Sequence, residues 1–229
     1  MAYTARTVSW AIGKAYVEAK MKATAPTSGN KFDSLISMAD TMQKNWAAEP
    51  GVEWNSLFEL YTLTPVVTAT ATFALHNDIQ YLSKGDNQYV IVTDGTQEKR
   101  YRVVKATQLD FYREQDACAQ VGRNLKFSKA FASDSSLLGY NIKVPAIKYA
   151  NDLTASTDTI QVDEPLWVAY MMAADFVRND VTKKDQYDNL IEYANVLMNK
   201  MKELNGGTID VIPTSSATVG STFAEGATW

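Results

Sequence analysis

Two residues, His76 and Cys118, have side chains of the kinds that commonly perform catalysis or bind metal ions. Each is the only residue of its type among the 229, so neither a disulfide within the chain nor a zinc site of several His and Cys ligands is expected. His76 stands two residues before Asp78, where a general base could be built, but no nucleophile motif with Ser or Cys lies near it. We interpret His76 as a turn residue and Cys118, between Ala117 and Ala119, as a small buried apolar side chain.

Acidic residues at two places in the C-terminal third could suggest a divalent cation site. They lack the alternating oxygen ligands and the central glycine of a calcium loop, and we interpret them as helix caps and solvated charges. They are Asp163, Glu164, Asp175, Asp180, Asp185 and Asp188. The sequence therefore predicts no catalytic residue, no cofactor and no metal ligand, and we expect a protein that is not an enzyme.

The densest basic cluster consists of residues 99–102 together with Lys105. On a strand, Arg100 and Arg102 share one face while Tyr101 and Val103 share the other, which is typical of an ordinary exposed strand rather than of a nucleic-acid site. No glycine-rich phosphate loop accompanies the cluster.

The composition fits a folded chain that carries little net charge. Apolar residues make up 46% of the chain, and 22 basic residues against 26 acidic ones give a formal charge of −4. This balance does not favour anionic membranes or a phosphate backbone as partners. The longest apolar run, 166–174, is too short to span a bilayer, and the N-terminus lacks the apolar core of a signal peptide.

Apolar spacing predicts helices at both ends of the chain. Residues 8–19 and 35–46 repeat at helical intervals, and breakers at 25–30 and Pro50-Gly51 bound the second of these helices. Helical spacing returns in 166–177 and in 187–204, and the last helix ends at Asn205-Gly206-Gly207.

The middle of the chain favours strands. Residues 89–93 and 101–104 flank Asp94-Gly95, which predicts a β-hairpin. Alternating apolar residues predict further strands within 57–75, at 125–127, 141–144 and 159–162, with a short helix at 106–115. The predicted fold class is α+β: a helical bundle formed by the N- and C-terminal helices, with a central β-rich insertion and an extended C-terminal tail. The N-terminal helices of the bundle occupy residues 1–56, the β-rich insertion 57–162, the C-terminal helices 163–206, and the extended tail that docks on a partner 207–229.

The last 23 residues differ from the rest because Thr, Ser and Gly fill about half of them. Ordering such a segment costs about 1–2 kcal/mol per residue in backbone entropy, so we expect it to need a surface to dock on. Docking on another chain is favoured and packing on its own domain stays open. The expected anchors are the apolar residues Ile209, Val211, Ile212, Val219, Phe223 and Trp229.

The order of several short pieces resembles the head-to-tail adaptor (connector or neck) proteins of tailed bacteriophages. The pieces are WAAEPGVEWNSL at 46–57, VVTATATFAL at 66–75, YVIVTDG at 89–95, VGRNL at 121–125, IKVPA at 142–146, TDTIQVD at 157–163, PLW at 165–167 and AADFVRN at 173–179, then Ala194-Asn195 and the methionine-rich last helix. The resemblance covers residues 30–205.

What the resemblance implies is a structural virion protein. Twelve copies are expected to form a ring between the portal protein and a tail or nozzle protein, in the neck of the virion, after assembly in the host cytoplasm. Double-stranded DNA would pass through the ring without sequence-specific binding. Two alternatives stay open: another structural subunit of a phage particle, in the tail or as a head decoration, or a small hydrolase built around His76.

Overall fold

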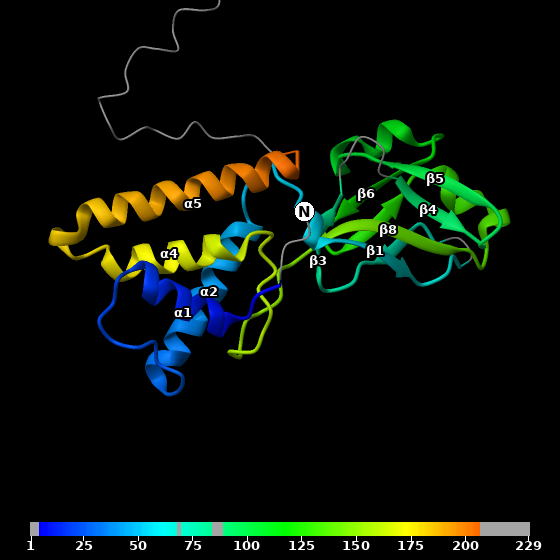
Figure 1. Cartoon of the computed structure of the whole chain (residues 1–229). Helices are drawn as coiled ribbons and strands as arrows, with labels where there is room; N and C mark the ends of the chain where they lie inside the picture. Colours follow the sequence, from blue (N-terminus) through cyan, green and yellow to red (C-terminus); the bar gives the residue numbers. More distant parts are fainter. Residues whose placement is uncertain (1–4, 68–69, 84–88, 207–229) are drawn as a thin grey trace, which may run out of the picture.

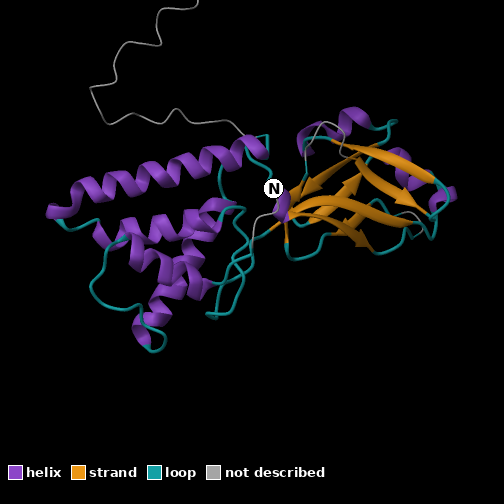
Figure 2. Cartoon of the chain, in the orientation of Figure 1, coloured by secondary structure: helices purple, strands orange, loops and turns teal. Residues whose placement is uncertain are grey.

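Helices and strands occupy separate parts of the molecule in the computed structural model, which describes residues 5–67, 70–83 and 89–206. Figures 1 and 2 show the long helices on one side and the strands on the other. The chain enters the sheet through the 3-10 turn Asn55–Leu57 and leaves it at the end of strand β8. Residues 149–164 then lead back to the helices.

The longer helices begin at residues suited to cap them. They are α1 (Val8–Glu18), α2 (Asn30–Ala47), α4 (Pro165–Val177) and α5 (Lys184–Leu204). The hydroxyl of Thr7 accepts a hydrogen bond from the Trp10 N–H at the start of α1, and Pro165 occupies the first turn of α4, where its missing N–H costs nothing. None of the helices in the described part of the chain is long and apolar enough to cross a membrane.

The apolar sides of these helices share one core. It includes Ile12, Trp46, Val168 and Ala194, each at most 1% exposed. The helices predicted over 8–19, 166–177 and 187–204 are confirmed, and α2 begins at Asn30, five residues before the apolar pattern that predicted it.

Eight strands form one curled sheet. They are β1 (Phe58–Leu63), β2 (Thr72–Ala74), β3 (Ile79–Leu82), β4 (Tyr89–Thr93), β5 (Glu98–Val103), β6 (Ala117–Val121), β7 (Asn124–Phe127) and β8 (Asn141–Lys148). Their order is β1-β8-β4-β5-β6-β7-β2, and β3 pairs with the far end of β8. All pairs are antiparallel except β5 with β6.

The predicted hairpin is confirmed as β4 and β5. Gly95 has a φ of 98°, which a glycine adopts without strain. The Asp94 carboxylate accepts hydrogen bonds from the N–H groups of Thr96 and Gln97 at 2.8 and 2.7 Å. These bonds lower the pKa of Asp94, with the bond from Gln97 as the largest cause.

Other local predictions need correction. The strand predicted at 159–162 is wrong, because only Thr159 makes a β-bridge, to Thr7. The helix predicted at 106–115 is a 3-10 helix over Ala106–Tyr112. Strand β6, Ala117–Val121, was not predicted, because two of its five residues are alanines, which have little strand preference.

The sheet part of the molecule holds its own aromatic core. The rings of Phe127 and Phe131 stack at 4.0 Å, and Tyr101 and Phe73 meet them edge to face. Tyr101 is fully buried. Aromatic pairs in these geometries contribute about 0.5–1.5 kcal/mol beyond the area that they bury.

The predicted fold class, a helical bundle with a central β insertion, is wrong. The chain is a mixed α/β protein dominated by the eight-stranded curled sheet, a half-barrel, and its long helices lie together beside that sheet. The prediction took the long amphipathic helices as the scaffold because their period is visible over many residues, whereas most strands have only three to six. The extended tail predicted over 207–229 lies outside the described residues.

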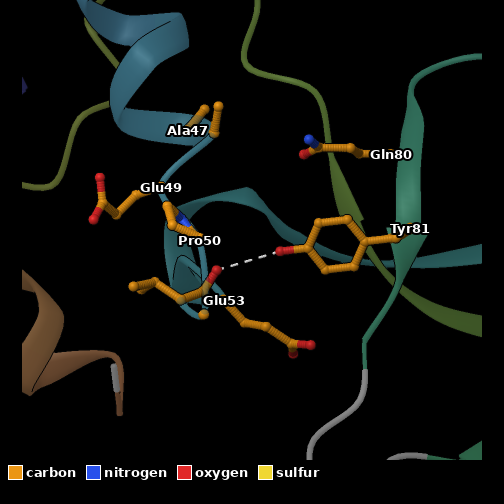
Figure 3. A pocket seen from close by; sticks show the side chains of 9 residues that line it. Ala47, Glu49, Pro50, Glu53, Gln80 and Tyr81 are labelled. Atoms are coloured by element: carbon orange, nitrogen blue, oxygen red, sulfur yellow. Dashed lines mark hydrogen bonds between the residues drawn. The ribbon is translucent and has the colours of Figure 1, made fainter. Parts of the chain in front are cut away.

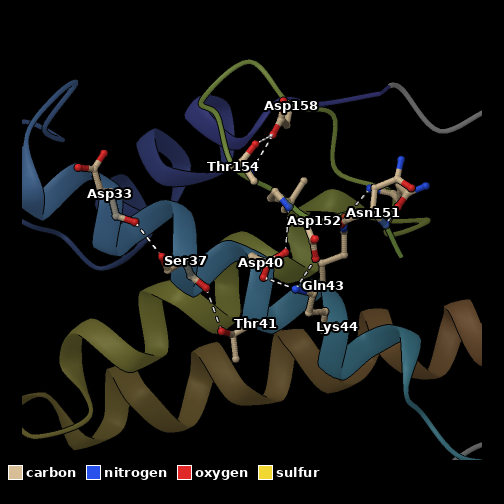
Figure 4. A network of polar contacts seen from close by, with 12 residues as sticks. Asp33, Ser37, Asp40, Thr41, Gln43, Lys44, Asn151, Asp152, Thr154 and Asp158 are labelled. Carbon is tan, nitrogen blue, oxygen red and sulfur yellow. Dashed lines mark hydrogen bonds and ion pairs between the residues drawn. The ribbon is translucent and has the colours of Figure 1, made fainter. Parts of the chain in front are cut away.

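A polar network fixes the return segment 149–164 on α2 (Figure 4). The amide of Gln43, a fully buried side chain, donates to the Asn151 carbonyl at 2.8 Å and accepts from the Gln161 N–H at 2.7 Å. One carboxylate oxygen of Asp40 accepts from the Leu153 N–H at 2.9 Å. The segment therefore depends on side chains more than 100 residues earlier in the chain.

Candidate functional site

A cavity of about 440 Å³ lies where the helices meet the sheet (Figure 3). One wall is the loop that follows α2, and the other is strand β3. The lining residues are Ala47, Ala48, Glu49, Pro50, Gly51, Val52, Glu53, Gln80 and Tyr81. We call this the junction cavity.

The loop that forms one wall is fixed by two tryptophans. Gly51, with a φ of 79°, turns the chain back after α2, so that the Trp54 ring stacks on Trp46 at 4.6 Å. The Trp54 indole N–H donates to the Trp46 carbonyl at 2.9 Å. Both side chains are fully buried, and the loop is therefore a rigid wall.

Charged and polar groups line the cavity and link its walls. Lys202 of α5, 3% exposed, pairs with Glu49 at 2.6 Å. The Glu53 carboxylate accepts from the Ser83 hydroxyl at 2.6 Å, and the Tyr81 hydroxyl donates to the Val52 carbonyl at 3.3 Å. Burial, with a smaller contribution from the charge of Glu53, raises the pKa of Tyr81. These contacts hold the helices against the sheet.

One acceptor of this cavity has no hydrogen-bond partner within the described residues. It is the side-chain oxygen of Gln80, which is buried, and Figure 3 shows the Gln80 amide directed toward the wall that carries Ala47. The carboxylates of Glu49 and Glu53 are already engaged by Lys202 and Ser83, so the polar groups of the lining serve mainly the contact between the helices and the sheet.

His76 and Cys118 occupy different surroundings in the structure. His76 is exposed between β2 and β3, with its ring 5.2 Å from that of Tyr61, and the Tyr61 hydroxyl donates to Asp78 at 2.8 Å. Cys118 is fully buried in β6, where its thiol points at the Tyr101 carbonyl 3.9 Å away. Burial raises the pKa of Cys118, and a buried protonated thiol is unreactive, so the interpretation of Cys118 as an apolar side chain is confirmed.

The acidic residues of the C-terminal third accept hydrogen bonds at helix starts and from a neighbouring side chain, and they do not gather in one cluster. Glu164 accepts from the Leu166 N–H, and Asp180 accepts from the Thr182 N–H and hydroxyl. Asp163 accepts instead from the Asn205 side chain at 2.9 Å. Within the residues that the structure describes, no group of three His, Cys, Asp or Glu side chains could hold a metal ion.

Residues 99–102 of the basic cluster lie on β5 and alternate as predicted, while Lys105 precedes the 3-10 helix that follows. Arg100 and Arg102 are exposed, while Tyr101 is buried on the opposite face. Lys99 pairs with Asp116 at 3.2 Å and with Asp134 at 3.1 Å. Burial alone would lower the pKa of Lys99, but its hydrogen bonds to Asp134 and Asp116 raise it. The cluster is thus partly neutralised by its own neighbours.

The predicted anchors of the tail lie outside the described residues. They are Ile209, Val211, Ile212, Val219, Phe223 and Trp229.

The sequence reasoning did not find the junction cavity, whose walls come from segments about 30 residues apart. Pro50-Gly51 marked the turn, but no local signal pairs that turn with Gln80.

The chain matches no protein-family model, and a search of curated proteins finds no match either. The function is therefore argued from the residues and from the surfaces that the fold exposes.

Proposed function

We propose that this protein is a structural subunit of a tailed-bacteriophage virion, a head-to-tail adaptor that assembles as a ring of twelve between the portal and the tail. The order of sequence pieces over residues 30–205 supports this family. The structural observation that carries the proposal is the outward side of α5, which has the composition of a contact surface between subunits.

Two exposed rows of residues run along α5. The first contains the large apolar side chains Tyr193, Val196 and Leu204, which are 55, 47 and 58% exposed. The second contains the polar residues Glu192, Asn195 and Glu203, also exposed. Tyr193 and Val196, three positions apart, share one side of the helix, and Leu204 lies on that side nearer its C-terminal end, beyond the exposed Lys200. We call these three apolar residues the α5 stripe.

A second apolar feature lies in the sheet part of the molecule. Phe111, in the 3-10 helix that follows β5, is 84% exposed. Head-to-tail contacts in a ring need two different surfaces on each copy, because the patch of one subunit meets another patch of the next. The α5 stripe and Phe111 supply two such surfaces in different parts of the chain.

The predicted tail has a separate role in this proposal. Its aromatic residues Phe223 and Trp229 would anchor the ring on the portal, since buried aromatic side chains dominate many interfaces. Removing residues 214–229, which contain these aromatic anchors, should then abolish binding to the portal ring while the circular dichroism spectrum and the melting temperature stay unchanged. Undiminished binding of the truncated protein would exclude the tail as the anchor.

The charge of the chain suits a ring around moving DNA. Each copy carries a formal −4, and a ring multiplies this charge around the channel. A negative lining does not retain phosphates. Tight, salt-sensitive binding of duplex DNA by the isolated ring would contradict this part of the proposal.

The ring contact is tested by charge substitution on α5. Val196→Glu places a carboxylate in the α5 stripe, and Asn195→Glu places the same charge in the neighbouring polar row. We expect the first variant to remain a folded monomer at concentrations where the parent protein and the second variant form rings, as measured by mass photometry. Equal assembly of all three proteins would exclude the stripe as a ring contact.

A further inference from the structure

One open edge of the sheet is strand β1. Within the described residues β1 pairs with β8 alone and ends the strand order of the sheet. Leu60, in its middle, is 51% exposed, and Phe58 is 39% exposed. An exposed edge of this kind is a template for another strand.

The register identifies which backbone groups of β1 are open. Leu60 lies opposite Pro145, which has no N–H, and the Pro145 carbonyl accepts from the Ser83 N–H at 3.0 Å on the other side of β8. The pair Leu60–Pro145 is therefore a non-hydrogen-bonded pair, in which both residues direct their backbone groups away from each other. By alternation, the N–H and C=O groups of Leu60 and Thr62 point to the open edge.

The described part of the chain ends beside the start of β1. The side-chain oxygen of Asn205 accepts a hydrogen bond from the Asn55 N–H at 2.8 Å, and Asn55 begins the 3-10 turn that leads directly into β1. The Asn205 amide also donates to Asp163 at 2.9 Å and to the Met201 carbonyl at 2.8 Å. The chain that follows Gly206 therefore starts about three residues before the open edge.

The sequence after Gly206 has the alternation of a strand. Residues 208–212 are Thr-Ile-Asp-Val-Ile, and Pro213 follows them. Ile209 and Val211 fall on one face of an extended chain, and a proline commonly stands where pairing stops. At about 3.3 Å per residue, five residues cover about 17 Å, which matches the about 20 Å length of a six-residue strand such as β1.

We propose that residues 208–212 pair with β1 of their own chain as a ninth strand, parallel to β1. The segment bonds to the open backbone groups of Leu60 and Thr62, and Ile209 with Val211 covers the exposed side chains of Phe58 and Leu60. The position of Asn205 beside Asn55 favours the same chain over a second copy, because no long connection is needed. Residues after Pro213, with Val219, Phe223 and Trp229, stay available for a partner.

Hydrogen–deuterium exchange at single-residue resolution tests this pairing on the full chain. One variant has residues 208–212 replaced by an alternating Gly-Ser stretch, and the matched control has residues 214–218 replaced in the same way. In the first variant the amides of Leu60 and Thr62 should exchange about tenfold faster than in the parent chain, the effect of losing a hydrogen bond. The amides of Glu59, Tyr61 and Leu63, which face β8, should be unchanged, and the control should match the parent.

Two results would overturn the proposal. If Leu60 and Thr62 exchange at the same rate in the parent and in the first variant, residues 208–212 do not cover the edge. If an excess of unlabelled parent chain restores slow exchange in the first variant, the strand comes from a second copy. The measurement needs no portal protein, so it stands or fails separately from the adaptor function.

Discussion

Gln43 offers the sharpest test of how the helices hold the return segment. Its amide is fully buried and forms two hydrogen bonds to the backbone, at Asn151 and Gln161. Gln43→Leu keeps the volume and removes both bonds. The Asn151 carbonyl and the Gln161 N–H then lose the partner that the buried Gln43 side chain supplied.

The expected loss follows from these two groups. A buried backbone group without a partner costs about 1–3 kcal/mol, and the exposed position of Asn151 lets water reach one of them. We therefore expect Gln43→Leu to lower the free energy of unfolding by about 2–3 kcal/mol. For a chain of this size that corresponds to a decrease in melting temperature of about 4–12 °C.

Urea denaturation followed by tryptophan fluorescence measures this difference. Thr41→Ala, an exposed position on the same helix whose hydroxyl bonds only within α2, is the control and should change the free energy by less than about 0.5 kcal/mol. A loss below about 0.5 kcal/mol for Gln43→Leu would refute the reasoning, because the network would then not hold residues 149–164.

Three further outcomes follow from the same geometry. Cys118 should react with a thiol reagent such as Ellman's reagent only after unfolding, and rapid modification of the native protein would contradict its burial. Glu49→Gln should destabilise the protein by about 1–3 kcal/mol in urea titrations, because it leaves the buried Lys202 charge without its carboxylate; the double variant Glu49→Leu with Lys202→Met should recover most of that loss. The N–H groups of residues 154 and 155 lower the pKa of Asp158 below its ordinary value. The stabilisation from the ionised Asp158 is therefore complete above about pH 4 and is lost as the pH falls through the lowered pKa. Asp158→Asn should be less stable than the parent at pH 7, with a difference that narrows below pH 4, and a difference independent of pH would exclude this role.

Local patterns were enough to predict the long helices and the hairpin. The apolar period over residues 187–204 covers most of the 21-residue helix α5, and Asp94-Gly95 favours a turn by the backbone conformation that Gly95 adopts. The pairing of β5 with β6 is different, because it joins Arg102 to Ala117 in parallel, and no nearby residue encodes such a contact. The sequence analysis did not predict that the sheet dominates the fold, because strand pairings of this kind have no local signal.

The candidate site was less accessible to sequence reasoning than the fold. Lys202 is buried against Glu49, yet in the sequence it looks like any lysine near the C-terminal end of a helix, where cations are common. Gln43 similarly lies on the buried side of α2 because its partners come from residues 151 and 161. Both positions follow from contacts between segments more than 100 residues apart.

The central claim is that this chain forms a ring that stacks on a portal. Mass photometry and negative-stain imaging of the purified protein, alone and mixed with a portal ring, test it most directly. The adaptor function predicts a closed ring with the mass of twelve chains of 25.4 kDa each, coaxial with the portal ring in the mixture. A protein that stays monomeric at micromolar concentration, both alone and with the portal, would contradict the claim.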